Sequence, residues 1–169
     1  RQKITTWIIP PQKRAGAYSW IEKKIKNERI QVFVVCPLIE ESEKETLKTI
    51  KAAKVEYENL KKIFKNLSVG LLHGRQSAKL KNQVLNRFRE GYTDILVATP
   101  VVEVGIDIIN ATIMVIEGAE RFGLAQLHQL RGRVGRGQKK SYCLLFTESR
   151  SQKVLSRLNA MTKTLTGFE

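Results

Sequence analysis

Residues 32–36 read VFVVC and residues 95–98 read ILVA, two apolar runs that contain no charged or amide residue. A strand with one solvated face alternates apolar and polar residues, whereas a strand covered on both faces is continuously apolar. These runs therefore predict strands buried between two layers of helices. Around them, short apolar runs alternate with longer amphipathic ones, which is typical of an α/β domain with a doubly wound, mostly parallel sheet and helices on both faces.

The same patterning predicts six strands and five helices along the chain. The strands are expected at 4–9, 31–36, 69–72, 94–98, 112–117 and 141–146, and the helices at 17–28, 43–64, 78–90, 124–134 and 152–164. Ser42 and Glu45 have the spacing of a capping box for the longest helix, and Gly91 is a natural stop after the third. The stretch 149–169 is expected to be an appended helix outside the sheet.

Length and composition set further bounds. A chain of 169 residues with 42% hydrophobic residues is most simply one domain with a real core. No apolar stretch is long enough to span a membrane, the first residues lack the features of a signal peptide, and the missing initial methionine suggests a piece of something longer. Cys36 and Cys143 lie inside apolar runs, which favours buried thiols over a disulfide or a metal site, and a reducing cytoplasm is the expected location.

The charge of the chain is strongly basic. Thirty Lys and Arg residues stand against sixteen Asp and Glu, which gives a net charge of +14 and a pI near 10.0. Basic groups on one face release counterions condensed on a nucleic acid, so this excess favours a polyanionic partner. The alternative is a set of solvated lysine-rich helix faces, because much of the excess lies in 23–29 and 48–65.

Several residues able to bind phosphate or ribose follow the predicted strands directly. In a parallel sheet the ligand site lies beyond the carboxyl ends of the strands, so these loops are expected to converge on one edge. Thr99 could hold a phosphate with its hydroxyl and a free backbone N–H, and Gly74 with Arg75 could let a phosphate backbone approach. Gly105 with Asp107 could place a carboxylate on a ribose hydroxyl. Taken alone, each is more readily an ordinary turn or a solvent-facing loop.

The segment 126–137, QLHQLRGRVGRG, is the richest in functional groups. In a helix of about 100° per residue, the leucines and Val134 fall on one side, while Gln126, Gln129, Arg133 and Arg136 fall on the other. A guanidinium binds phosphate through a planar, permanently charged fork. The segment therefore predicts a helix with a core-facing side and a phosphate-binding side.

This segment resembles the sixth conserved motif of superfamily 2 helicases, in which a glutamine or histidine precedes G-R-x-G-R. Residues 98–108, ATPVVEVGIDI, are similar to the fifth motif, and residues 69–75, VGLLHGR, look like the segment between the fourth and fifth motifs. Residues 37–43, PLIEESE, together with 120–137, resemble the RecG branch of bacterial DNA helicases. The motor of that branch closely parallels that of the transcription-repair coupling translocase.

The resemblance implies the second of two RecA-like lobes in an ATP-dependent helicase acting on branched DNA in replication-fork repair and recombination. Residues 1–148 would form this P-loop NTPase-like lobe, and 149–169 the start of a C-terminal helical extension. ATP with Mg²⁺ would be bound mainly by the missing N-terminal lobe, because no Walker A is present: after Gly132–Gly137 stands Gln138 in place of the required lysine. The fragment alone is expected to be inactive.

The resemblance also implies roles for individual residues on the nucleotide side. Arg133 and Arg136 match the arginines that reach the phosphates, and Gln129 stands where the family has glutamine or histidine. Gly105 and Asp107 match nucleotide-side positions of the fifth motif. These five residues would complete an ATP site in cis with the other lobe.

On the nucleic-acid side, Thr99, Gly74 and Arg75 match family positions that touch the DNA backbone. No metal ligands are expected in the chain, and no membrane contact. Three alternatives stay open: the motor lobe of a transcription-repair coupling translocase, a non-catalytic nucleic-acid-binding module that kept the fold, and a small-molecule α/β enzyme using the basic edge for a phosphorylated substrate.

Overall fold

The computed structural model describes residues 3–39, 46–100 and 108–166. The strands are β1 (Ile4–Ile9), β2 (Gln31–Val35), β3 (Val69–Leu72), β4 (Ile95–Ala98), β5 (Ala111–Ile116) and β6 (Ser141–Phe146). The helices are α1 (Arg14–Glu28), α2 (Leu47–Ile63), α3 (Ala78–Arg89), α4 (Leu124–Arg131) and α5 (Gln152–Thr166), with short 3-10 turns η1 (Pro11–Lys13) and η2 (Ala119–Arg121).

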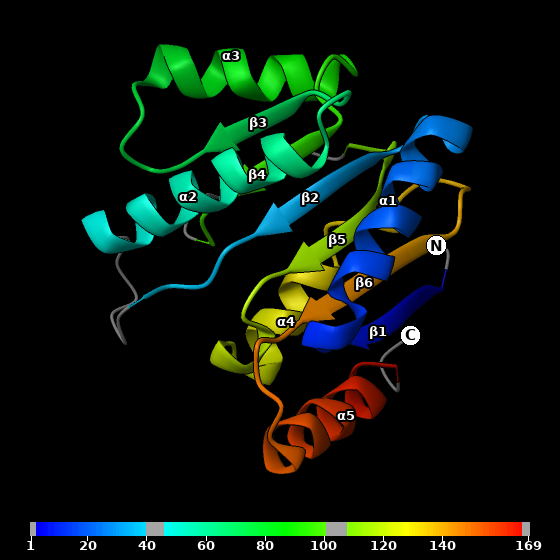
Figure 1. Cartoon of the computed structure of the whole chain (residues 1–169). Coiled ribbons are helices and arrows are strands. Elements are labelled where there is room, and N and C mark those ends of the chain that lie inside the picture. Colours follow the sequence, from blue (N-terminus) through cyan, green and yellow to red (C-terminus); the bar gives the residue numbers. More distant parts are fainter. Residues whose placement is uncertain (1–2, 40–45, 101–107, 167–169) are drawn as a thin grey trace.

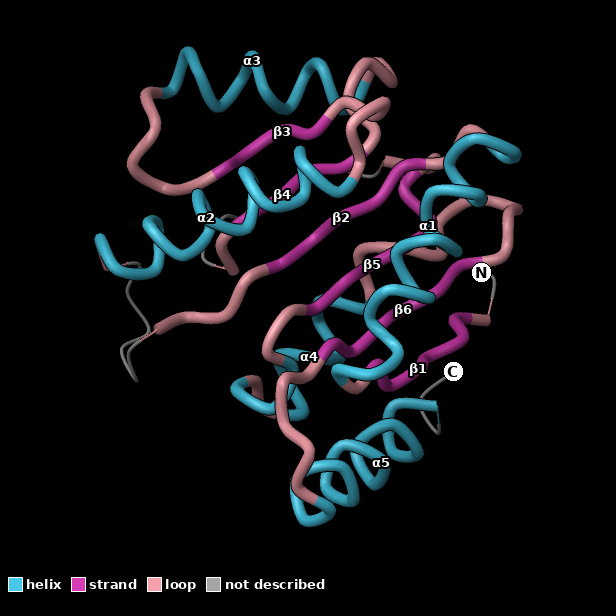
Figure 2. Tube along the Cα trace, in the orientation of Figure 1, coloured by secondary structure: helices cyan, strands magenta, loops and turns pink. Residues whose placement is uncertain are grey.

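The strands form a six-stranded sheet in the order β1-β6-β5-β2-β4-β3, and every described pairing is parallel (Figures 1 and 2). The prediction of a doubly wound, mostly parallel α/β sheet is confirmed. The connection that leaves β2 runs through α2, and the one that leaves β5 runs through α4 on the opposite face (Figure 1). The carboxyl edge between these neighbouring strands is thus a point where the winding reverses, the usual place for a ligand.

Two apolar layers hold the sheet between its helices. Alternate residues of β2 point to opposite faces, so Val32 and Val34 join one cluster with α1 and α2, while Phe33 and Val35 join another with α3, α4 and α5. All five residues of β2 are buried. The continuously apolar run in the sequence follows directly from this double coverage.

Capping and turn residues, rather than periodicity, set where two of the helices begin or end. The longest helix begins at Leu47, capped by Thr46, whose Oγ1 accepts a hydrogen bond from the N–H of Thr49 at 3.2 Å. The predicted cap, Ser42 with Glu45, lies outside the described residues. Gly91 does stop the third helix: its φ is +84°, and the N–H of Tyr92 bonds to the carbonyl of Arg87 at 2.9 Å, as in a Schellman motif.

The two cysteines are buried within the sheet, Cys36 just after β2 and Cys143 in β6, and both thiols are free. Burial raises the pKa of each thiol, that of Cys143 to about 12. Both therefore stay protonated and unreactive near neutral pH. Among the described helices, none is both long enough and apolar enough to cross a membrane.

The final helix, α5, packs against β1 at the edge of the sheet. Its Leu158 and Leu165 are fully buried in the same apolar cluster as α4 and β6. The helix lies outside the sheet, as expected, but it contributes to the main core.

Candidate functional site

The strand ends from which the predicted loops start lie at one edge of the sheet. Val35 pairs with Ala98 on one side and with Ile116 on the other, and Ala98 pairs in turn with Leu72. The last residues of β2, β3, β4 and β5 are therefore abreast, and the segments after them start from a common rim. This carboxyl rim is the candidate site.

After β3 the chain makes a tight turn through Gly74 and Arg75, both exposed. Gln76 closes the turn, because its Oε1 accepts from the N–H of His73 at 3.0 Å and its Nε2 donates to the carbonyl of Leu71 at 2.9 Å. His73 is buried, and its Nδ1 accepts from the N–H of Arg75 at 3.2 Å. His73 is thus a satisfied loop histidine that shapes the turn, while Arg75 reaches solvent on the rim.

Thr99 follows β4 and differs in part from expectation. Its backbone N–H donates to the carbonyl of Leu72 at 3.3 Å, and the residue is only 1% exposed. The expectation of a free backbone N–H at this position is wrong, because the β3–β4 ladder continues one residue beyond β4. Gly105 and Asp107 lie outside the described residues.

The arginine segment is only partly helical. α4 ends at Arg131, and the N–H groups of Arg133 and Val134 bond three residues back, to the carbonyls of Leu130 and Arg131 at 3.1 and 3.2 Å. The predicted helix to residue 134 is therefore too long, and Arg133 and Arg136 stand on the turns that follow. The reason is the density of glycine here, since each glycine costs a helix about 1 kcal/mol relative to alanine.

The two sides of the segment nevertheless separate as predicted. Leu127, Leu130 and Val134 are buried in the core. Gln129 is exposed on α4, Arg133 is half-buried, and Arg136 is exposed, with its Nε donating to the carbonyl of Gly132 at 3.4 Å. Gln126 has a structural task, because its Oε1 accepts from the N–H of Gly123 at 3.0 Å and so caps the start of α4.

Gly137 fixes where the arginine segment runs. A Cβ atom at this position would stand 2.7 Å from Cγ2 of Ile109 and 3.2 Å from its carbonyl oxygen. Only glycine therefore lets the end of the segment pack against Ile109, which leads into β5. The close approach fixes the segment against the chain that enters β5.

Arg131, unlike Arg133 and Arg136, is a buried arginine, and its structural role was not predicted from the sequence. It is 3% exposed, and its guanidinium donates to the carbonyl of Leu165 at 3.1 Å and to that of Ile4 at 3.3 Å. It ties α4 to α5 and to β1. The helical-wheel pattern offered a signal, because Arg131 adjoins Leu127 and Leu130 rather than the exposed glutamines.

A second feature of the rim was also missed. Arg14 at the start of α1 binds Glu117, just after β5, through both terminal guanidinium nitrogens at 2.6 and 3.2 Å. One of these nitrogens also binds Glu148, after β6, at 2.6 Å. Burial lowers the pKa of Arg14, but the hydrogen bond and charge of Glu117 outweigh it and raise the pKa overall. Arg14 and Glu117 are 103 positions apart, so nothing local in the sequence announces the pair.

The described ranges contain no group of three or more His, Cys, Asp or Glu residues placed to hold a metal ion. The rim carries arginine, hydroxyl and amide groups instead. Such groups suit phosphate and nucleic-acid backbone, which they bind by charge and by hydrogen bonding.

A parallel, doubly wound sheet, with Arg75 and Thr99 after strand ends at its carboxyl rim and an arginine segment that ends beside the chain entering β5, defines a RecA-like α/β lobe. Residues 16–138 match the model of the family described as helicase conserved C-terminal domain. The chain belongs to that family.

Comparison with known proteins narrows the relationship. The chain is 51% identical over 169 residues to the ATP-dependent DNA helicase RecG of Synechocystis, covering 99% of this chain and 20% of that protein. It is 44% identical over 170 residues to the RecG of Thermotoga maritima, covering 100% of this chain and 21% of the relative. The chain thus spans about a fifth of the length of these relatives.

Solved structures agree with the sequence comparison. A structure of RecG bound to a three-way DNA junction matches 96% of this chain and 20% of its own, with a TM-score of 0.75 and 41% identity. The C-terminal domain of the DEAD-box protein Dbp5 matches 99% of this chain and 88% of its own, with a TM-score of 0.68 and 21% identity. The second likeness bears on the fold alone.

Proposed function

We propose that this chain is the second motor lobe of a RecG-type, ATP-dependent DNA helicase that acts on branched DNA in replication-fork repair and recombination. The observation that carries the proposal is the match to RecG over the whole chain, at 51% identity to one relative and a TM-score of 0.75 to the junction-bound structure. The translocase of transcription-repair coupling has less support, because the relatives compared above are RecG proteins. We assign the lobe to residues 1–148 and a C-terminal helical extension to 149–169, in the cytoplasm.

In this proposal the arginine segment completes an ATP site whose other half belongs to the first lobe. Arg133 and Arg136 neutralise phosphate charge that spreads during phosphoryl transfer, and Gln129 with Gly105 and Asp107 contacts the nucleotide. Arginines in such a position contribute about 10³–10⁵ in rate. The exposure of Arg136 beyond the end of α4 supports this assignment, because the guanidinium can meet a ligand held by another lobe.

Mg²⁺ accompanies ATP as its counterion, and the described residues of this chain do not offer a carboxylate cluster for it. We therefore assign the metal ligands to the first lobe, together with the Walker A lysine. This chain alone should not hydrolyse ATP.

Gly74 and Arg75, both exposed on the carboxyl rim, contact the DNA backbone there, and Thr99, which is 1% exposed, would join them only once its side chain is uncovered. Closure of the two lobes on ATP and their separation after hydrolysis change the spacing between the backbone contacts of each lobe, which moves the motor along DNA. Because phosphate contacts carry no base information, translocation should show little sequence preference.

The proposal is tested in the longer protein that carries this lobe. Arg133→Ala and Arg136→Ala should each lower DNA-stimulated ATP hydrolysis by 100-fold or more, while binding to a forked DNA stays within a factor of about three. Arg89→Ala is the matched control, because Arg89 is exposed in the last turn of α3 and its guanidinium donates to Asn86 of the same helix. Near-normal turnover in both variants would overturn the assignment. If the lobe only binds DNA, the unmodified protein would not hydrolyse ATP, and the two arginine variants would bind forked DNA more weakly.

A further inference from the structure

A groove unrelated to the candidate site runs between α1 and the edge strand β1. Its volume is about 440 Å³, and its walls include Trp7, Ile9, Ala17, Trp20 and Leu144. Gly16 forms part of its margin, where a side chain would meet no atom within 4 Å. The groove is wide, open to solvent and largely apolar.

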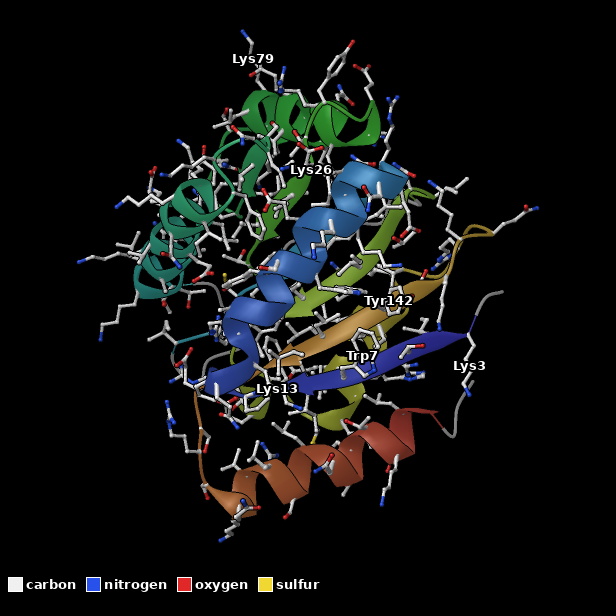
Figure 3. All side chains as sticks on the ribbon, turned by 45° about the vertical axis from the view of Figure 1, so that its right-hand side comes forward. Lys3, Trp7, Lys13, Lys26, Lys79 and Tyr142 are labelled. Atoms are coloured by element: carbon white, nitrogen blue, oxygen red, sulfur yellow. The ribbon has the colours of Figure 1, made fainter. Side chains whose placement is uncertain are left out.

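An aromatic platform lies along one side of this groove. Trp7 packs on Tyr142 with ring centroids 5.2 Å apart and against the edge of Trp20 at 5.3 Å, while Trp20 and Tyr142 meet at 4.8 Å. Figure 3 shows Trp7 and Tyr142 next to one another on the adjacent strands β1 and β6. Three mutually packed rings hold each other in place, so the platform is rigid.

Trp7 remains 41% exposed although its neighbours support it from one side. A large ring left half in water forgoes the free energy that its burial would give. A flat, apolar partner that stacks on the exposed part of the ring would recover that free energy.

Lysines surround the platform. Lys24 lies 5.6 Å from the ring centre of Trp20 and 5.3 Å from that of Tyr142, and Lys140 lies 5.5 Å from that of Tyr142. Lys13 stands at the start of α1 and Lys3 at the start of β1 (Figure 3). Glu28 pairs with Lys24 at 2.8 Å, which leaves an excess of positive charge around the groove.

We propose that this groove is a second nucleic-acid site, which binds single-stranded DNA by stacking a base on Trp7 while the surrounding lysines contact phosphates. A rigid aromatic face inside a basic, open groove is the combination that binds single strands without sequence preference. An apolar peptide would use the rings but not the lysines, so the charge of the rim favours the nucleic acid. The site lies between α1 and β1 rather than at the ends of β2 to β5, and it does not depend on ATP.

The chain itself supplies the probe. Trp7 and Trp20 are its two tryptophans, and both line the groove. Titration of the 169-residue chain with a twelve-nucleotide oligo(dT) should quench tryptophan emission and shield it from acrylamide. An abasic oligomer of the same length should bind more weakly and leave the emission nearly unchanged.

Variants separate stacking from simple charge attraction. Trp7→Ala should weaken binding to oligo(dT) by about 5- to 100-fold, whereas Trp7→Phe, which keeps a ring, should lose much less. Tyr92→Ala is the matched control, because Tyr92 is 62% exposed at the far end of α3 and should not matter. The acrylamide measurement on the unmodified chain needs no variant, so it holds even if Trp7→Ala fails to fold.

Equal quenching by the abasic oligomer, or unchanged affinity in a folded Trp7→Ala variant, would overturn the proposal. So would quenching by an uncharged apolar peptide together with none by oligo(dT), which would identify the groove as a protein-docking site. Because the readout is independent of ATP, its failure leaves the motor assignment untouched.

Discussion

Arg14 and Glu117 form a two-point ion pair, 2.6 and 3.2 Å long, that joins the start of α1 to the carboxyl end of β5. The guanidinium also lies 4.8 Å from the ring centre of Phe146. The side chains are 22% and 12% exposed, so water screens the pair only weakly. The pair fixes α1 against the rim that carries the candidate site.

Replacing Arg14 by alanine should lower the free energy of unfolding by about 2–3 kcal/mol, because it leaves the Glu117 carboxylate half-buried without its partner. Urea denaturation measures the change. Lys26→Ala is the matched control: its pair with Glu22 is more exposed and should contribute at most about 0.5 kcal/mol. Equal losses of unfolding free energy in the two variants would show that the Arg14–Glu117 pair stabilises the fold no more than the exposed Lys26–Glu22 pair.

Glu56 on α2 makes stability depend on pH. Burial, and then the negative charge of Glu117, raise the pKa of Glu56 from 4.5 to about 7, against the opposing charge of Arg14. Between these values the folded protein holds a proton that the unfolded chain releases. The Glu56 contribution to stability is therefore full below pH 4.5 and is lost as the pH rises through about 7.

Glu56→Gln should remove this slope of unfolding free energy against pH. It should also raise the unfolding free energy at pH 8 by about 1 kcal/mol, a figure reduced because water partly screens the group. Unfolding in urea from pH 5 to pH 8, compared between variant and parent, isolates the effect from other titrating groups. Glu58→Gln, an exposed change two residues along the same helix, should leave the slope as it is. A slope that survives in Glu56→Gln would assign it to another group.

Arg131→Ala should destabilise the chain by about 3 kcal/mol without any direct part in ATP chemistry, because two buried carbonyls lose their donor. Lysine should restore only part of the loss, since a single ammonium does not reproduce the planar fork. Thermal unfolding measures both variants, with the exposed Arg150→Ala as control, expected within about 0.5 kcal/mol of the parent. Parent-like stability of Arg131→Ala would exclude the proposed anchoring.

Gly137→Ala should cost about 1–3 kcal/mol, because its methyl group would overlap Ile109. Ile109→Ala should relieve much of that cost in the double variant, and a double-mutant cycle on the unfolding free energy measures the coupling. Gly16→Ala is the contrasting control: it has open space in a helix and should stabilise by about 0.5–1 kcal/mol. Additive effects at 109 and 137 would contradict the packing argument.

Periodicity was enough to predict the strands, because each run is short, apolar and bounded by turns; 4–9, 69–72 and 141–146 match the observed bounds. The start of α2 at Leu47 depends on the Thr46 cap, and the end of α4 at Arg131 depends on closely spaced glycines. Such single-residue effects move a helix boundary by less than periodicity can resolve. The rim could be anticipated because parallel strands share one carboxyl end.

What could not be anticipated were contacts between distant residues. The helical wheel places Arg131 beside Leu127 and Leu130, but its carbonyl partners at positions 4 and 165 are far away in the sequence. The groove lined by Trp7 and Trp20 likewise joins residues from β1, α1 and β6. Such relationships depend on how the chain closes on itself, and no window of neighbouring residues contains them.

One guanidinium, that of Arg131, holds the first strand and the last helix together. Ile4 and Leu165 both accept hydrogen bonds from it, so the two ends of the described chain lie close together. A single short connection would therefore span them. This closeness also means that the chain could be circularly permuted, its ends joined by a short linker and a surface loop opened elsewhere, while the sheet order stays the same.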